Sequence, residues 1–138
     1  MVVIGGGEVG VEAGMHLAQN GHEVTVLEMS HKLAPESTLS HYYSMFQDAW
    51  EAIPTFHSVV NATVTSVEDD CVKYKDSEGV EHAIPCDSVV ISLGMKPLQE
   101  EALSFYDCAT RFAFIGDCRK PGTVQHAMRH AYAVSHSV

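Results

Sequence analysis

Three glycines near the start of the chain have the spacing of a nucleotide-binding turn. Gly5, Gly7 and Gly10 form G-x-G-x-x-G directly after the apolar run of residues 1–4. The first glycine permits a tight turn, the second lets a pyrophosphate approach the backbone, and the third lets a helix pack closely on a strand. The phosphates would then meet the N–H groups that open the helix. This spacing therefore predicts binding of a dinucleotide, and a glycine-rich turn without a ligand is the alternative.

An acidic residue follows at the distance that such a turn requires. Glu28 ends a β-branched run about 20 residues after the glycines, where a carboxylate can accept hydrogen bonds from both hydroxyls of an adenosine ribose. A 2′-phosphate there would face a like charge, so Glu28 favours NADH over NADPH, although His31 and Lys32 nearby could soften that preference. The pattern does not separate NAD from the ADP half of FAD, because both carry the same ribose and pyrophosphate.

The hydrophobic pattern around these residues predicts a right-handed β-α-β unit. Residues 1–4 are all apolar, as in a parallel strand that is buried on both faces. Residues 8–19 have helical spacing, and an Asn-Gly pair then supplies a C-terminal stop. The apolar stripe of this helix is expected at Val9, Ala13 and Leu17. The alternating run 22–28 predicts the second strand.

The remainder of the chain predicts further strands and two more helices. A polar loop over residues 30–43 comes first, and the helix after it should end near Pro54. The expected elements are a helix at 44–52, meander strands at 62–68, 71–77 and 80–86, strands at 88–94 and 111–117, and a helix over 123–138. The predicted fold class is therefore α/β, a Rossmann-like parallel sheet flanked by helices with an antiparallel three-strand β-meander.

The composition disfavours several kinds of partner and site. The 18 acidic and 8 basic side chains leave a net charge of -10, which would repel nucleic acid and anionic lipid surfaces. No run approaches the roughly 18 apolar residues of a membrane span and the start lacks signal-peptide features, so a cytoplasmic location is expected. The four cysteines form no C-x-x-C pair and no histidine lies in H-E-x-x-H, so neither a metal site nor a dithiol is predicted.

The glycine-rich segment resembles a known family. "GGGEVGVEAG", residues 5–14, is similar to the nicotinamide-binding insert of flavoproteins with two dinucleotide-binding domains, where G-G-G-x-x-G-x-E-x-A is usual. The resemblance implies that Glu12 lies near the nicotinamide and the flavin. A solvated carboxylate in the first part of the helix, favoured by the helix dipole, is the alternative. Gly14 stands where the family more often has a larger residue.

Two further segments resemble the same superfamily, in the same order. "VVISLGMKPL" resembles the hinge usually written A-T-G-x-x-P, with Ser92 and Leu93 replacing Ala-Thr and with Gly94 and Pro97 retained. "FAFIGDCRKPGTVQHAMRHAY" resembles the return segment in which the aspartate of G-D binds the ribityl chain of FAD. The resemblance implies that role for Asp117, for which a turn or helix-capping role is the alternative.

The segment "IGDCRKPG", followed by an alanine-rich helix, resembles one branch of the superfamily most closely. This branch is the C-terminal reductase part of the Old Yellow Enzyme-type NADH:flavin oxidoreductases, which include relatives of 2,4-dienoyl-CoA reductase and trimethylamine dehydrogenase. The resemblance implies an upstream barrel with FMN and a 4Fe-4S cluster in a longer parent, truncated here. It also implies an NAD(H)-binding domain over residues 1–109 and a return segment of the FAD domain over 110–138.

The expected function is that of an NADH-binding module, which delivers hydride from NADH to FAD in the full-length parent. No catalytic residue is predicted in this chain, and the fragment alone is expected to be inactive. Its partners would be the dinucleotide and the rest of the flavoprotein, and residues 110–138 are expected to pack back on the first domain or to exchange into a homodimer. The predicted cofactor-binding residues are Gly5, Gly7, Glu8, Val9, Gly10, Glu12, Glu28, Met29, Lys32, Gly94 and Asp117.

Two other functions remain open from the residues. The chain could be a stand-alone nucleotide-binding or sensing domain without turnover, although a flavin-contact segment such as "FIGDC" would have no purpose there. It could also be part of a pyridine nucleotide-disulfide reductase whose dithiol lies further upstream.

Overall fold

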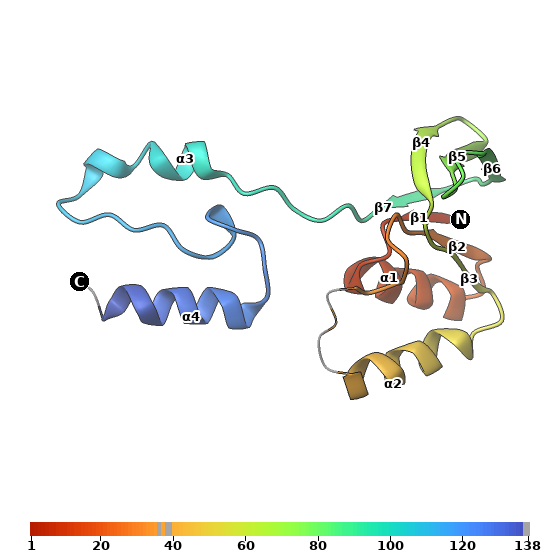
Figure 1. Ribbon diagram of the computed structural model, residues 1–138, viewed down its shortest axis with the longest axis horizontal. Coiled ribbons are helices and arrows are strands. Elements are labelled where there is room, and N and C mark those ends of the chain that lie inside the picture. The colour runs from red at the N-terminus through yellow and green to blue at the C-terminus, as the bar shows by residue number, and fades with distance from the viewer. Residues whose placement is uncertain (36, 38–39, 137–138) are drawn as a thin grey trace. The chain divides into compact units, whose positions relative to one another are not determined.

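The computed structural model describes residues 1–35, 37 and 40–136, and it divides into two compact units, Met1–Gly94 and Met95–Val138 (Figure 1). The division follows Gly94, whereas the sequence suggested a domain boundary between residues 109 and 110. That boundary concerns domains of a longer flavoprotein, so it stays a prediction. Among the helices that the structure describes, none is long and apolar enough to cross a membrane.

A four-stranded parallel sheet forms the centre of the first unit. Its strands are β1 (Val2–Ile4), β2 (Val24–Leu27), β3 (Phe56–Val59) and β7 (Val89–Ile91), in the order β3-β2-β1-β7. Val3 pairs with Val26 on one side and with Val90 on the other, so the expected β-α-β unit and its central first strand are confirmed. The sequence did not predict β3, because its inner residues His57 and Ser58 are exposed and the run lacks a strand-like alternation.

The two faces of this sheet are covered by different elements. The helices α1 (Glu8–Gln19) and α2 (Ser40–Glu51) lie on one side, as Figure 1 shows. Their core includes Val11 of α1 and Phe46 and Trp50 of α2, packed with Val3 and Val26 of the sheet. On the other face, an antiparallel meander packs Val72 and Tyr74 against Val2, Ile4 and Leu27. The alternation of Val2, Val3 and Ile4 between two cores explains why β1 reads as an all-apolar run.

The meander has the three strands that the sequence predicted. They are β4 (Thr63–Val67), β5 (Cys71–Lys75) and β6 (Glu81–Pro85), in the order β4-β5-β6. The pairing of β4 with β5 shifts between Val64 and Ser66, which leaves a bulge on β4. β4 is therefore an irregular edge strand, and it lies at the edge of the groove described below.

The buried face of α1 differs from the predicted stripe. Val9 is 72% exposed, whereas the buried residues of the helix are Gly10, Val11, Gly14 and Ala18. A Cβ placed on Gly14 would lie 3.0 Å from atoms of both Phe56 and Val26, which is tight contact with the sheet. Gly10 and Gly14 let the helix backbone approach closely, and Val11 and Ala18 fill the space beside them, so the buried face is centred on these four residues.

The second unit contains short helices and no strand among its described residues. Its elements are α3 (Gln99–Leu103), η1 (Tyr106–Cys108), η2 (Gly116–Cys118) and α4 (Val124–Ser135). The predicted helix at the end of the chain is confirmed as α4, and Thr123 caps it by accepting a hydrogen bond from the N–H of His126. The strand predicted at 111–117 is wrong, because this unit provides no second strand to pair with it. No described residue of this unit is buried.

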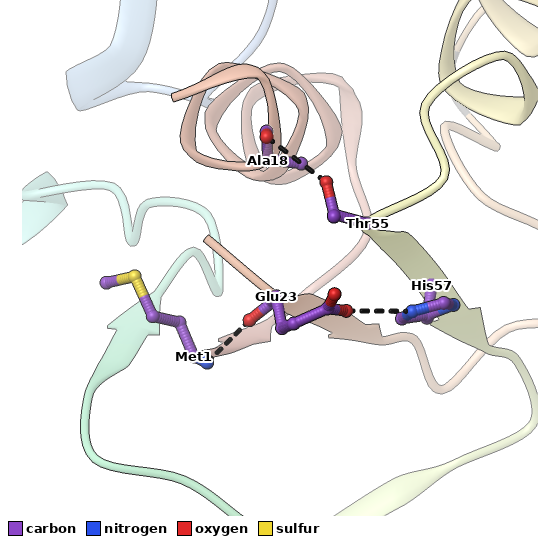
Figure 2. A network of polar contacts seen from close by, with 5 residues as sticks. All are labelled: Met1, Ala18, Glu23, Thr55 and His57. Carbon is purple, nitrogen blue, oxygen red and sulfur yellow. Dashed lines mark hydrogen bonds and ion pairs between the residues drawn. The ribbon is translucent and has the colours of Figure 1, made fainter. Parts of the chain in front are cut away.

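A polar network fixes the amino ends of the strands in the first unit (Figure 2). The Met1 amine donates to the carbonyl of Glu23 at 2.7 Å, and the Glu23 carboxylate lies 3.2 Å from Nε2 of His57. The Thr55 hydroxyl donates to the carbonyl of Ala18 at 3.1 Å, which satisfies a carbonyl in the last turn of α1. These contacts connect β1, β2, β3 and α1 at the edge opposite to the glycine turn.

Candidate functional site

The glycine turn joins β1 to α1 in a geometry that larger residues would not permit. Gly5 has a φ of +100° and donates its N–H to the carbonyl of Leu27 at 2.9 Å. A Cβ placed on Gly5 would collide with the carbonyl of Ser92, and one placed on Gly10 would collide with the carbonyl of Gly5. These two glycines therefore fill the roles that the spacing predicted, a tight turn and a close approach between helix and strand.

Gly7 places the start of α1 at the end of this turn. It is the N-cap residue, with φ −64° and ψ 173°, and it offers no side chain to accept from the first helical N–H groups. Its carbonyl accepts the N–H of Val11 at 2.9 Å, so the helix begins directly at the turn. An anion can accept hydrogen bonds from the N–H groups at a helix start, and the helix dipole favours a negative charge at this end.

Glu28 has the position predicted for it, at the end of β2, but its side chain is already engaged with the protein. It is only 8% exposed. One carboxylate oxygen accepts the N–H of Gly6 at 2.7 Å, and the other accepts the N–H of Ser30 at 2.7 Å. A carboxylate has about four acceptor positions, so each oxygen retains one for a ribose hydroxyl. The ribose contact therefore stays a prediction, and the carboxylate also holds the glycine turn.

The loop after Glu28 fixes Gly6 from its other side. Ala34 donates its N–H to the carbonyl of Gly6 at 2.7 Å. Ala34 is fully buried and has a φ of +44°, a left-handed conformation that non-glycine residues rarely adopt. The side chains of Leu33 and Glu28 occupy the space where a Cβ of Gly6 would lie. Both polar groups of Gly6 are therefore held by the segment 28–34, which keeps the turn in one conformation.

A groove of about 580 Å³ opens at the carboxyl ends of the parallel strands. From β1 the chain continues to β2 and β3 on one side, whereas β7 pairs with β1 on the other side. The groove lies at β1, where the strand order reverses. Open α/β sheets bind their ligands at this kind of crevice. Its lining residues are Ile4, Gly5, Gly7, Leu27, Glu28, Met29, Pro35, Ala62, Thr63, Val64, Thr65, Ser66, Val67, Ile91, Ser92, Leu93 and Gly94.

Five of the predicted site residues come together at this groove. They are Gly5, Gly7, Glu28, Met29 and Gly94. Met29 is 74% exposed, and Gly94 has a φ of +78° with open space around it. The groove thus joins the glycine turn, the acidic end of β2 and the end of β7.

The other predicted residues lie outside the lining of the groove. Glu8 is half-buried and Glu12 is exposed on α1, while Gly10 packs the helix against the turn. Lys32 places its ammonium 4.8 Å from the centroid of the Tyr43 ring. Asp117 lies in the second unit, where it accepts the N–H of Gly122 at 3.3 Å. Its contact is that of a turn residue, and its predicted flavin role stays a prediction, as do the cofactor roles of Val9 and the other residues of this group.

The sequence missed much of the groove wall. The meander contributes Ala62, just before β4, and residues 63–67 of this irregular edge strand, and no local motif marked them. Ser92 could have been found, because the residue after a parallel strand lies at the carboxyl edge where ligands bind. Its N–H donates to the carbonyl of Ile4 at 2.8 Å, so it lies beside the glycine turn.

Three groups of the meander have shifted pKa values. The Ser66 hydroxyl, which donates at 2.8 Å, and the nearby Lys73 lower the pKa of Glu68. The hydrogen bond from His82 lowers the pKa of Asp76 most, burial opposes it, and the backbone N–H groups of Val80 and Glu78 lower it further. Burial raises the pKa of the Cys71 thiol. These shifts follow from strand ends and turns, so they do not indicate an acid or base for catalysis.

Comparison with known proteins agrees with this geometry. The family model described as pyridine nucleotide-disulphide oxidoreductase matches residues 1–111. Bilirubin reductase from Mediterraneibacter gnavus is 29% identical over 133 residues, which are 96% of this chain and 20% of that protein. NADH oxidase from Thermoanaerobacter brockii is 27% identical over 136 residues, 98% of this chain and 21% of that protein.

Solved structures of reductases also match this chain. A 2-naphthoyl-CoA reductase in complex with 2-naphthoyl-CoA matches with a TM-score of 0.82 and 25% identity over 99% of this chain and 21% of that chain. Thioredoxin reductase from T. acidophilum matches with a TM-score of 0.55 and 30% identity over 70% of this chain and 31% of that chain. The chain thus spans about a fifth of the length of the curated relatives it matches. From the glycine turn, the sheet and the family match over residues 1–111, the chain belongs to the pyridine nucleotide-disulphide oxidoreductase family of flavin-dependent enzymes, which bind FAD and NAD(P)H.

Proposed function

We propose that this chain is the NADH-binding part of a longer flavin-dependent oxidoreductase of the NADH oxidase or enoate reductase type. NADH held in the groove would supply a hydride to an FAD bound by other parts of that protein. The observation that carries the proposal is the groove itself, in which the uncapped start of α1 and the buried Glu28 face one space at the carboxyl edge of the sheet.

The residues of the groove fit the two halves of a dinucleotide. The turn at Gly5 and Gly7 and the N–H groups that open α1 suit a pyrophosphate, because they offer donors and no bulk. Glu28 retains acceptor positions for the hydroxyls of the adenosine ribose. The other half would then cross β1 toward Ser92 and Gly94 at the end of β7. The protein binds and orients the cofactor here, and no described residue is assigned an acid or base role.

The reductase branch is supported by how far the relatives match. The matches to the NADH oxidase and to the 2-naphthoyl-CoA reductase extend over nearly the whole chain and so include the second unit. We infer that residues 110–138 belong to an FAD domain in the parent, with Asp117 beside the ribityl chain. FMN and a 4Fe-4S cluster in upstream domains, the relation to Old Yellow Enzyme-type reductases and a cytoplasmic location belong to the same proposal.

A disulphide reductase is the second candidate, favoured by the match to thioredoxin reductase. The four cysteines of this sequence form no C-x-x-C pair. A dithiol would therefore have to lie in other parts of the parent, so the reductase of the first proposal fits these residues better.

Calorimetric titration of the purified chain with NADH, NADPH, ADP-ribose and FAD tests the proposal. We expect NADH and ADP-ribose to bind and NADPH and FAD to bind much more weakly. Gly7→Val should abolish binding and still fold, because the backbone angles of Gly7 are open to any residue while a side chain there blocks the pyrophosphate. If FAD binds best, or if the variant binds NADH as well as the original chain, the proposal is wrong.

A further inference from the structure

Lys32 lies in the loop that follows the acidic end of β2, but a ring on α2 holds its side chain. Its ammonium nitrogen is 4.8 Å from the centroid of the Tyr43 ring, within the range of a cation–π contact. Lys32 is absent from the lining of the groove, although Glu28 and Met29 belong to it. The charge of Lys32 is therefore paired with an aromatic face of the protein itself.

The ring of Tyr43 is held in place by the core of the first unit. Its ring meets the Trp50 ring edge to face, with centroids 5.9 Å apart and an interplanar angle of 82°. Trp50 is only 6% exposed and belongs to the core between α2 and the sheet, against which Tyr43 also packs. The ring that faces Lys32 is thus fixed by the core.

The backbone of Lys32 starts close to the position where an adenosine ribose would lie. Ser30 donates its N–H to the Glu28 carboxylate at 2.7 Å and its hydroxyl to the carbonyl of Lys32 at 2.8 Å. Ser30 thus links the backbone of Lys32 to the Glu28 carboxylate, which is the group expected to bind the ribose hydroxyls. A cation in this loop would attract the 2′-phosphate of NADPH and offset the repulsion by Glu28.

We propose that Tyr43 is a positioning residue for cofactor selection: by holding the Lys32 ammonium on its ring, it leaves Glu28 as the charge that a 2′-phosphate meets. The inference rests on the proposed binding of a dinucleotide in the groove. It also reverses the role that the sequence suggested for Lys32, which becomes a cation kept away from the cofactor. The site then discriminates against NADPH through a contact between residues that do not line the groove.

Two substitutions at Tyr43 separate the effect of its aromatic ring on Lys32 from the effect of its packing against the core. Tyr43→Leu removes the aromatic face and keeps an apolar residue against the core, so Lys32 is released. Tyr43→Phe keeps the ring and serves as the matched control. The dissociation constants of NADH and NADPH are measured by calorimetry for both variants, for Lys32→Met and for the double variant Y43L/K32M. Urea unfolding followed by Trp50 fluorescence checks that each variant is folded.

Tyr43→Leu is expected to bind NADPH about two- to fivefold more tightly, which is the effect of an exposed cation–π contact of about 0.5–1 kcal/mol at about 1.4 kcal/mol per tenfold. Its affinity for NADH should not change. Tyr43→Phe and Lys32→Met should bind both cofactors as the original chain does, and Y43L/K32M should lose the gain.

Three results would overturn the inference. They are no gain in a folded Y43L variant, a gain that persists in Y43L/K32M, and a loss of NADH or NADPH affinity in Lys32→Met. If Tyr43→Leu fails to fold, Lys32→Met still tests the inference. Failure of the proposed function looks different, because the original chain would then bind neither NADH nor ADP-ribose.

Discussion

Glu28→Gln is the substitution that best separates the structural role of this carboxylate from a role in the cofactor site. In the original chain both oxygens accept backbone N–H groups at 2.7 Å, from Gly6 and from Ser30, and the side chain is 8% exposed. Glutamine has nearly the same shape, but its amide nitrogen must face one of these two donors. One hydrogen bond is lost, and a buried N–H is left without an acceptor.

The size of the effect follows from that lost contact. A hydrogen bond to a charged group contributes about 1.5–3 kcal/mol. With an m-value of about 1–3 kcal/mol/M in urea, the unfolding midpoint should fall by roughly 0.5–3 M. Trp50, the single tryptophan, lies in the core of the same unit and reports its unfolding by fluorescence. NADH affinity should fall as well, because the glycine turn loses one of its two restraints.

The matched control is Glu101→Gln, which removes the same charge from an exposed residue of α3 in the second unit. It should leave the midpoint of the first unit unchanged. If Glu28→Gln lowers the midpoint no more than this control does, the carboxylate does not hold the turn. Glu28 would then serve the cofactor alone.

Three other predictions concern the meander, the helix contact and the second unit. Asp76 has a lowered pKa, so its contribution to stability is present above the ordinary carboxyl pKa and is lost as the pH falls through the folded pKa. Asp76→Asn should therefore lower the urea midpoint at neutral pH and remove part of the loss of stability in acid. An unchanged dependence of the midpoint on pH would contradict the contact with His82. Gly10→Ala should cost about 1–3 kcal/mol and more than Gly14→Ala, because the added methyl meets backbone in the first case and side chains in the second; equal unfolding midpoints would refute this order. Limited proteolysis should cut within residues 95–136 first, since no described residue there is buried, and mass spectrometry that finds the first cuts before Gly94 would be evidence against it.

The sequence predicted those parts of the fold that depend on local patterns. β1, β2 and the meander have regular apolar spacing, and they occur where this spacing places them. β3 lacks that spacing because its middle residues face water, and its identity as a strand comes from pairing with β2. The segment 111–117 shows the converse, because its apolar run is typical of a strand but finds no partner in its own unit. Pairing over long distances in the chain decided both cases.

The same limit applies to the site. The spacing of the glycines and of Glu28 placed them correctly at one edge of the sheet. What the carboxylate contacts could not be predicted, because it depends on a loop that folds back and on the left-handed conformation of Ala34. The side of α1 that faces the sheet was missed for a related reason, since two of its four buried residues are glycines, which carry no apolar signal in the sequence.

A change of cofactor preference should therefore be made at Met29 and not at Glu28. Glu28→Arg would remove both contacts at 2.7 Å and bury a cation, so we expect it to lose NADH and NADPH alike. Met29 lines the same groove and is 74% exposed, and Met29→Arg would offer a guanidinium to a 2′-phosphate without disturbing Gly6.

For Met29→Arg we expect about tenfold tighter binding of NADPH, about 1.4 kcal/mol, with NADH affinity within a factor of about two. Met29→Gln, polar but uncharged, is the control and should show no gain in calorimetry. A switch toward NADPH in Glu28→Arg, with none in Met29→Arg, would mean that the carboxylate selects the cofactor directly and is dispensable for the turn. The hydrogen bonds of Glu28 and Ala34 to Gly6 predict the opposite result, a switch in Met29→Arg and none in Glu28→Arg. Cofactor preference can change only at a residue on which the glycine turn does not depend.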